Sequence, residues 1–188
     1  ATCLREAQDI ARAGADFVVA QGWEAGGHRG SFDPSQPDEE LPVLALVRSL
    51  LDCLSIPIVA AGGMMDGRDI AAVLAAGATA AQLGTAFLCC DEAGTPCAHR
   101  EALREGEEET VFTSAFSGRP ARGMRNTFID AMAEIGLVGG GKPAGWAGCR
   151  SGMLAPDDDP STIDGANCES AAFVLVPPQL AAELAPSR

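Results

Sequence analysis

Residues 57–85, with the sequence PIVAAGGMMDGRDIAAVLAAGATAAQLGT, contain two short strand-like runs separated by a helical segment. The run 57–61 is apolar and uninterrupted, which is typical of a strand buried on both faces of a parallel sheet. The run 80–83 predicts a second, shorter strand. Between the two runs, Asp66 is placed to cap a helix that Gly77 ends. The stretch therefore predicts a strand–helix–strand unit.

The same alternation continues on both sides of this unit. Upstream, residues 3–13 have helical periodicity, the apolar run 15–20 predicts a strand buried on both faces, and residues 41–54 are again helical. Downstream, residues 98–105 predict a helix, and 111–116 predict a strand or an extended segment. Repeated strand–helix units indicate an α/β fold with a parallel sheet, either doubly wound or a (β/α)8 TIM barrel.

The number of predicted strands is too small for a complete barrel. A barrel needs eight strand–helix units and about 250 residues, whereas this chain has 188 and opens on a helix. We therefore expect the C-terminal part of a longer protein, truncated at its N-terminus. The regular pattern fades near residue 131, so we expect a half-barrel domain over residues 1–128 and a divergent, partly irregular tail over 129–188.

Charge and cysteine content exclude several classes of function. The formal net charge is −13, so the chain should repel phosphate backbones and bind no nucleic acid. No apolar run reaches the roughly 18 residues that a membrane span needs. The seven cysteines are odd in number and show no CxxC spacing, which favours free thiols in a reducing cytoplasm over disulfides or a metal site.

The loop that follows the strand at 15–20 is the first candidate site. Its sequence, QGWEAGGHRG over residues 21–30, has four glycines that allow close backbone approach to a ligand. His28 lies among them and can act as a base near neutral pH. The alternative is a flexible loop with a solvated histidine. Its position after a strand favours a site, since barrel sites form at the C-terminal ends of strands.

Two further motifs follow the next two predicted strands. Gly62 and Gly63 end the strand at 57–61, and Gly84 and Thr85 end the strand at 80–83. Backbone N–H groups at such strand ends can hold a phosphate. Each motif alone is better explained as an ordinary turn, but the two motifs at successive strand ends favour a phosphate site.

Taken in order, AQGWEAGGHRG, the stretch from PIVAAGG to QLGTAFL, and FTSAFSGRPARGMRN resemble the nitronate monooxygenase family over roughly residues 3–128. The resemblance implies a (β/α)8 barrel that binds FMN non-covalently. It also implies the oxidation of alkyl nitronates with O2 to a carbonyl compound and nitrite.

The resemblance carries specific residues onto this chain. His28 matches the catalytic histidine, which takes a proton from a nitroalkane carbon or orients the nitronate; Arg29 either assists it or forms a structural ion pair. Flavin contacts are implied for Gln21 and Gly26. The FMN phosphate loops are implied at these positions: Gly62, Gly63, Gln82, Leu83, Gly84 and Thr85.

Two alternatives stay open from the sequence. The FMN-dependent enoyl-ACP reductase has a similar EAGGH loop and would need NAD(P)H and an acyl-carrier partner. A half-barrel could instead bind a phosphate ligand or a partner chain without catalysis. Uncovered strand edges and apolar faces would in either case favour self-association.

Overall fold

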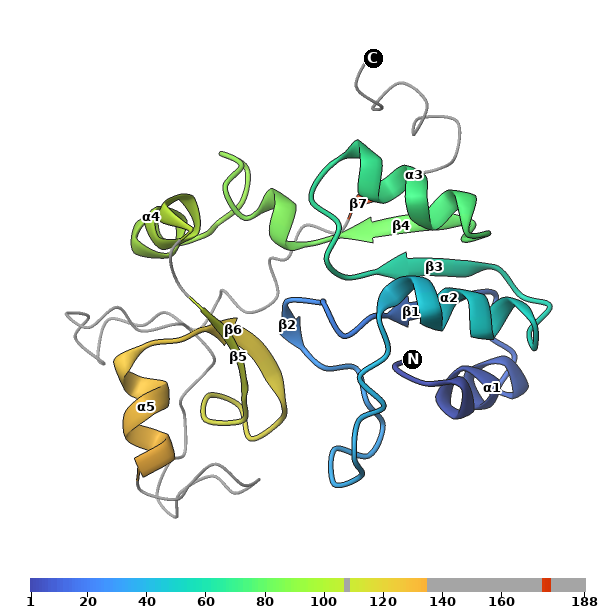
Figure 1. The fold of residues 1–188 in the computed structure, drawn as a ribbon, viewed down its shortest axis with the longest axis horizontal. Helices are drawn as coiled ribbons and strands as arrows, with labels where there is room; N and C mark the ends of the chain where they lie inside the picture. The colour runs from blue at the N-terminus through green and yellow to red at the C-terminus, as the bar shows by residue number, and fades with distance from the viewer. Residues whose placement is uncertain (107–108, 135–173, 177–188) are drawn as a thin grey trace. The chain divides into compact units, whose positions relative to one another are not determined.

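The computed structural model describes residues 1–106, 109–134 and 174–176 (Figure 1). These residues belong to two compact units, one formed by Ala1–Ala86 with the strand at 174–176, the other by the described residues from Phe87 to Glu134. The first unit holds all of the predicted site residues. Its main sheet contains β1 (Val18–Gln21), β3 (Ile58–Ala61), β4 (Ala80–Leu83) and β7 (Val174–Val176).

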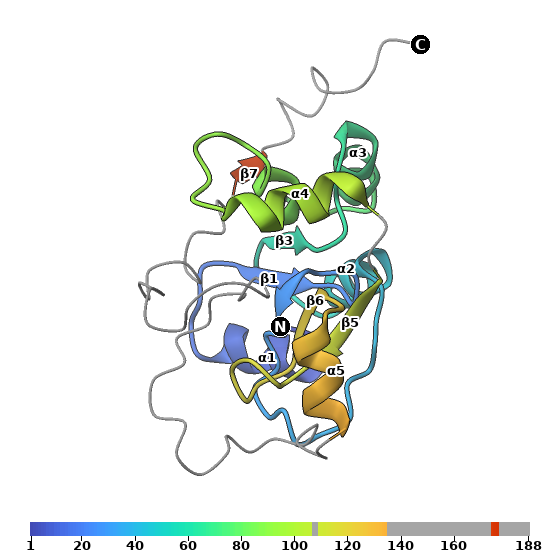
Figure 2. The same cartoon turned by 90° about the vertical axis from the view of Figure 1, so that its left-hand side faces the viewer.

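The sheet has the order β1-β3-β4-β7, and its first three strands are parallel. Three helices accompany them: α1 (Leu4–Arg12), α2 (Val43–Leu51) and α3 (Gly67–Ala75). Because β1, β3 and β4 follow one another in a single direction, right-handed crossovers place α2 and α3 on the same face of the sheet. Helix α2 contacts both α1 and α3, so the three helices form one layer (Figures 1 and 2).

The core of this unit lies between the helix layer and the sheet. Its largest fully buried side chains come from β1, β3, α2 and α3 and are Leu46, Leu50, Ile58, Val18, Val47 and Val73. The strand–helix–strand prediction for residues 57–85 is confirmed, with β4 at the predicted residues. Asp66 caps α3 by accepting hydrogen bonds from the N–H groups of Arg68 and Asp69, and the Asp69 carboxylate completes a capping box.

The prediction that residues 15–20 are buried on both faces is wrong for this strand. β1 begins at Val18, and Phe17 before it is 48% exposed. Val18 and Ala20 are buried while Val19 and Gln21 are partly exposed, which is the alternation of a strand with unequal faces. The physical reason is that β1 lies at the edge of the described sheet, whereas the inner strand β3 is buried at all four of its positions.

The second unit contains an antiparallel hairpin between two helices. The elements are α4 (Cys97–Glu105), β5 (Thr110–Thr113), β6 (Ala121–Met124) and α5 (Thr127–Glu134). Arg122 lies 4.2 Å from the ring centroid of Phe112 across the hairpin, and the rings of Phe116 and Phe128 stack at 5.2 Å. The extended segment predicted at 111–116 is thus the first strand of this hairpin.

Two elements fall within the divergent, partly irregular tail that the sequence predicts over residues 129–188. Residues 129–134 complete α5, in which Ile129 and Met132 are buried. Residues 174–176 form β7, which pairs antiparallel with β4. Ile129 and Met132 are spaced as on one face of a helix, whereas β7 depends on its pairing with the distant β4. The remainder of the predicted tail lies outside the described residues.

Candidate functional site

The glycine-rich loop after β1 crosses the C-terminal ends of β3 and β4. A Cβ atom added to Gly62 would lie 2.9 Å from the backbone nitrogen of Ala25, and one added to Gly63 would lie 2.7 Å from Cβ of Glu24. A Cβ added to Gly26 would lie 2.7 Å from Oγ1 of Thr85. The structure therefore brings the three predicted motifs together, and glycine is required where they meet.

The backbone at the end of β3 also requires glycine for conformational reasons. Gly62 has φ = 112° and Gly63 has φ = 71°, a region that other residues rarely adopt. The N–H groups of Gly63, Gly84 and Thr85 belong to residues that follow the ends of β3 and β4. Gly63 and Thr85 are exposed, and Gly84 is partly exposed. Backbone N–H groups gathered at such strand ends can bind an anion such as a phosphate.

Gln82 and Leu83 lie in β4, just before Gly84 and Thr85. Gln82 pairs with Ala61 of β3, and Leu83 is buried. Their position in the strand fixes where Gly84 and Thr85 emerge at the sheet edge.

Glu24 links the loop to helix α2. Its two carboxylate oxygens lie 3.2 and 3.0 Å from the backbone nitrogen of Val43, the first residue of α2. Pro42, the preceding residue, offers no capping side chain. Glu24 therefore caps the helix from a distant position, where the positive end of the helix dipole stabilises its charge.

The side chain of Arg29 bonds the backbone at Gln21, and the side chain of Gln21 bonds the backbone on both sides of Arg29. The Nη1 of Arg29 donates to the carbonyl oxygens of Gln21 and Gly22, each at 2.8 Å. The side-chain amide of Gln21 donates to the carbonyl oxygen of His28 at 2.9 Å and accepts from the N–H of Gly30 at 2.7 Å. We call this arrangement the Gln21–Arg29 clamp.

Asp38 completes the clamp on the far side of the guanidinium. Arg29 donates from Nε and Nη2 to the two carboxylate oxygens of Asp38 at 2.7 and 2.9 Å. The hydrogen bonds from Arg29 lower the pKa of Asp38 below its ordinary value, and the N–H of Glu40 adds to this effect. The Arg29 guanidinium also lies 5.4 Å from the ring centroid of Trp23. The side chain of Arg29 is only 2% exposed, so its ion pair with Asp38 is buried within the loop.

His28 lies in the two-residue strand β2 (Gly27–His28) and is exposed. Exposure is what a side chain needs if it is to exchange a proton with a small molecule. The sequence singled out His28, Gln21 and the glycines, but it missed Glu24 and Asp38. Nothing in the sequence near Glu24 or Asp38 indicates that the first caps α2 or that the second pairs with Arg29.

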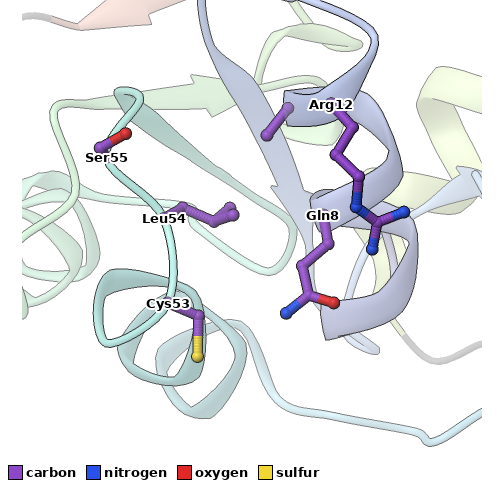
Figure 3. A pocket seen from close by; sticks show the side chains of 6 residues that line it. Gln8, Arg12, Cys53, Leu54 and Ser55 are labelled. Carbon is purple, nitrogen blue, oxygen red and sulfur yellow. The ribbon is translucent and has the colours of Figure 1, made fainter.

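A surface hollow of about 410 Å³ lies elsewhere on this unit (Figure 3). Its lining comes from α1 and from the turn between α2 and β3: Gln8, Ala11, Arg12, Cys53, Leu54 and Ser55. Ser55 precedes β3 and Arg12 precedes β1, so the hollow lies at the N-terminal ends of the strands. None of the predicted site residues lines it.

The described part of the chain holds neither a group of metal ligands nor a membrane-spanning helix. In this part of the chain, no three His, Cys, Asp or Glu side chains are grouped as a metal ion would require. None of its helices is long and apolar enough to cross a membrane.

Comparison with known proteins gives a consistent result. The profile of the family described as "Nitronate monooxygenase" matches residues 1–144. The nitronate monooxygenase of Paraburkholderia phytofirmans is 54% identical over 135 residues, which are 71% of this chain and 37% of the relative. That of Pseudomonas aeruginosa is 53% identical over 135 residues, 71% of this chain and 38% of the relative. The chain thus spans less than half the length of these curated relatives.

Two solved structures share the fold of the same region. A nitroalkane oxidase from Streptomyces ansochromogenes is 49% identical with a TM-score of 0.68, covering 71% of this chain and 40% of its own. FabK from Thermotoga maritima is 35% identical with a TM-score of 0.61, covering 72% of this chain and 41% of its own. Since the family profile matches most of the sequence, this chain belongs to the nitronate monooxygenase family.

Proposed function

We propose that this chain supplies the phosphate-binding and proton-transfer part of an FMN-dependent enzyme that oxidises alkyl nitronates with O2 to a carbonyl compound and nitrite. The observation that carries the proposal is the meeting of three loops at the ends of β1, β3 and β4. The contacts of Gly26 with Thr85 and of Gly62 with Ala25 define this meeting point. The relatives named nitronate monooxygenase and nitroalkane oxidase support the reaction class.

The FMN phosphate would be held by the N–H groups of Gly63, Gly84 and Thr85. Their residues follow β3 and β4 directly, at the edge of the sheet where the glycine-rich loop meets them. Gln82 and Leu83 place this group at the strand end, and Gly26 leaves room for the Thr85 hydroxyl. When bound, FMN would supply the redox chemistry, while the protein orients it and excludes competing reactions.

His28 would hold or move the proton in this reaction. As a neutral imidazole it accepts a proton from the carbon next to a nitro group, and as a cation it attracts the anionic nitronate. Its exposed position in β2 lets substrate reach it. Because Arg29 is buried and His28 is exposed, we assign the positive charge that attracts an anionic substrate to His28 and not to Arg29.

We further propose that the first unit is part of a (β/α)8 barrel. A doubly wound sheet carries helices on both faces, whereas α1, α2 and α3 form a single layer. Within this sheet β3 has a parallel neighbour on each side, as a barrel strand does, whereas β4 pairs on its outer side with the antiparallel β7. On the side of β1 away from β3, the terminal ammonium of Ala1 donates to the carbonyl oxygen of Val19 at 2.8 Å, and the carbonyl oxygen of Ala1 accepts from the N–H of Gln21 at 2.9 Å. Uncovered parts of such a sheet would favour self-association.

A pair of histidine variants tests the catalytic assignment. In the full-length enzyme, His28→Ala should retain FMN but lower the turnover of nitroalkanes by roughly 10²–10⁴-fold, the usual effect of losing a general base. His99→Ala is the matched control, because His99 lies in α4 of the other unit. Unchanged turnover in His28→Ala would remove His28 as the base.

The enoyl reductase alternative receives less support. FabK is less similar to this chain than the nitroalkane oxidase, both in identity and in TM-score. Anaerobic addition of NADH or NADPH separates the two functions. The reductase alternative requires fast bleaching of the flavin absorbance, which our proposal does not require.

A further inference from the structure

The Gln21–Arg29 clamp encloses the backbone of the residue that the proposed reaction depends on. His28 precedes Arg29 directly, and its carbonyl oxygen is held by the amide of Gln21. The same amide holds the N–H of Gly30, on the other side of Arg29. The backbone on both sides of Arg29 is therefore fixed to the end of β1.

The guanidinium of Arg29 makes a second set of bonds to the end of β1. Nη1 of Arg29 bonds the carbonyl oxygens of Gln21 and Gly22, where β1 ends. Because Arg29 and Gln21 each fix the backbone that carries the other, loss of one weakens the support of both. This mutual arrangement ties the backbone on both sides of Arg29 to the end of β1.

We propose that Arg29 is a positioning residue, which helps to fix the backbone that carries His28 to the end of β1 and so sets the position of its imidazole. The role assigned to His28 itself rests on the proposed function. Arg29 acts through the backbone of the loop, since its side chain is buried and bonded to Asp38 and to the end of β1.

The geometry explains why arginine is needed at this position. Three nitrogens of one planar group reach different partners: Nε and Nη2 bond the carboxylate of Asp38, and Nη1 bonds two carbonyl oxygens. A lysine would keep the charge, but its single ammonium nitrogen cannot occupy three positions of a rigid fork. Arg29→Lys should therefore preserve the ion pair with Asp38 and lose the bonds to the end of β1.

Histidine NMR spectra of the whole 188-residue chain test the proposal without FMN or substrate. The sequence contains two histidines, His28 and His99, so two imidazole signals are expected. The His28→Ala variant assigns them. The variants to compare are Arg29→Met, Arg29→Lys and Asp38→Asn. Arg48→Met, on the exposed side of α2, is the matched control.

We expect Arg29→Met to move the His28 signal toward the position that it takes in the urea-unfolded chain. Arg29→Lys should move it part of the way, and Asp38→Asn should have a smaller effect because an amide still accepts one hydrogen bond. The His99 signal should stay in place in all of them, and Arg48→Met should change neither signal.

Two results would overturn the proposal. One is an unmoved His28 signal in folded Arg29→Met. The other is a joint movement of both histidine signals in Arg29→Lys and Asp38→Asn, because Arg29 would then support the whole fold and not His28 in particular. Flavin retention and nitroalkane turnover test the proposed function separately, so a failure there leaves the NMR result readable.

Discussion

Replacement of Gly62 by alanine should destabilise the chain through two separate effects. The first is conformational: Gly62 has φ = 112°, and a left-handed backbone costs a residue with a Cβ about 1–2 kcal/mol. The second is steric: the new Cβ would lie 2.9 Å from the backbone nitrogen and 3.0 Å from the Cα of Ala25. Forcing an extra methyl group into a packed site costs about 1–3 kcal/mol.

Gly14 offers a matched control for the conformational effect. It has φ = 85°, and a Cβ added there would meet no atom within 4 Å. Gly14→Ala should therefore lose only the conformational part, whereas Gly62→Ala should lose about 2–5 kcal/mol in total. The difference between the two variants isolates the contact between the glycine-rich loop and the end of β3.

Urea unfolding followed by circular dichroism measures this difference. The free energy of unfolding falls by roughly 2 kcal/mol per M of urea. The urea concentration at which half of the Gly62→Ala variant is unfolded should therefore lie about 0.5–1.5 M below that of Gly14→Ala. Equal midpoints would mean that the loop moves freely away from Gly62. The convergence of the three loops would then be refuted as a property of the folded chain.

Two further predictions concern stability. Asp66→Ala removes the capping box of α3 and should cost about 0.5–2 kcal/mol in urea unfolding, while Asp52→Ala, at the end of α2, should cost nothing. An undiminished midpoint for Asp66→Ala would count against the cap. Burial alone would raise the pKa of Glu6, but hydrogen bonds from Phe32 and Thr2 outweigh it and lower the pKa. Glu6 therefore stabilises the fold above the ordinary glutamate pKa of about 4.3, and this stability is lost as the pH falls through the lowered value. Glu6→Gln should flatten the pH dependence of the unfolding free energy in that acid range, and an unchanged slope would contradict this.

The sequence predicted the elements whose signals are local. The helix α3 was predicted from Asp66 and Gly77, which form its cap and its end. β4 was predicted because its apolar run stands between turn residues. Such elements are specified by helix caps and by turn residues, which act on their neighbours in the chain.

The elements that were missed depend on distant partners. β7 needs the free edge of β4, which lies about ninety residues earlier in the sequence. β6 has the sequence ARGM, in which the charged Arg122 interrupts the apolar pattern of a strand. In the folded chain, Arg122 packs over the ring of Phe112 in β5. The start of β1 was placed too early because hydrophobicity alone cannot show that Phe17 is exposed.

The candidate site divides in the same way. Gly62 and Gly63 were predicted from their position after a strand, and their positive φ angles show why glycine is needed there. Glu24 and Asp38 were missed because their partners, Val43 and Arg29, are reached only after the loop has folded. Carboxylates in a solvated loop and carboxylates that cap or clamp look the same in a sequence.

The most direct test of the proposed FMN site is gel filtration of the purified chain after incubation with FMN, with riboflavin as the control. Riboflavin has the same ring system without the phosphate that Gly63, Gly84 and Thr85 are proposed to bind. We predict that FMN, with absorbance peaks near roughly 370 and 450 nm as expected of a flavoprotein, elutes with the protein and riboflavin does not. Gly84→Trp should abolish the retention. A folded chain that elutes colourless from both flavins, or that keeps both equally, would contradict the phosphate site.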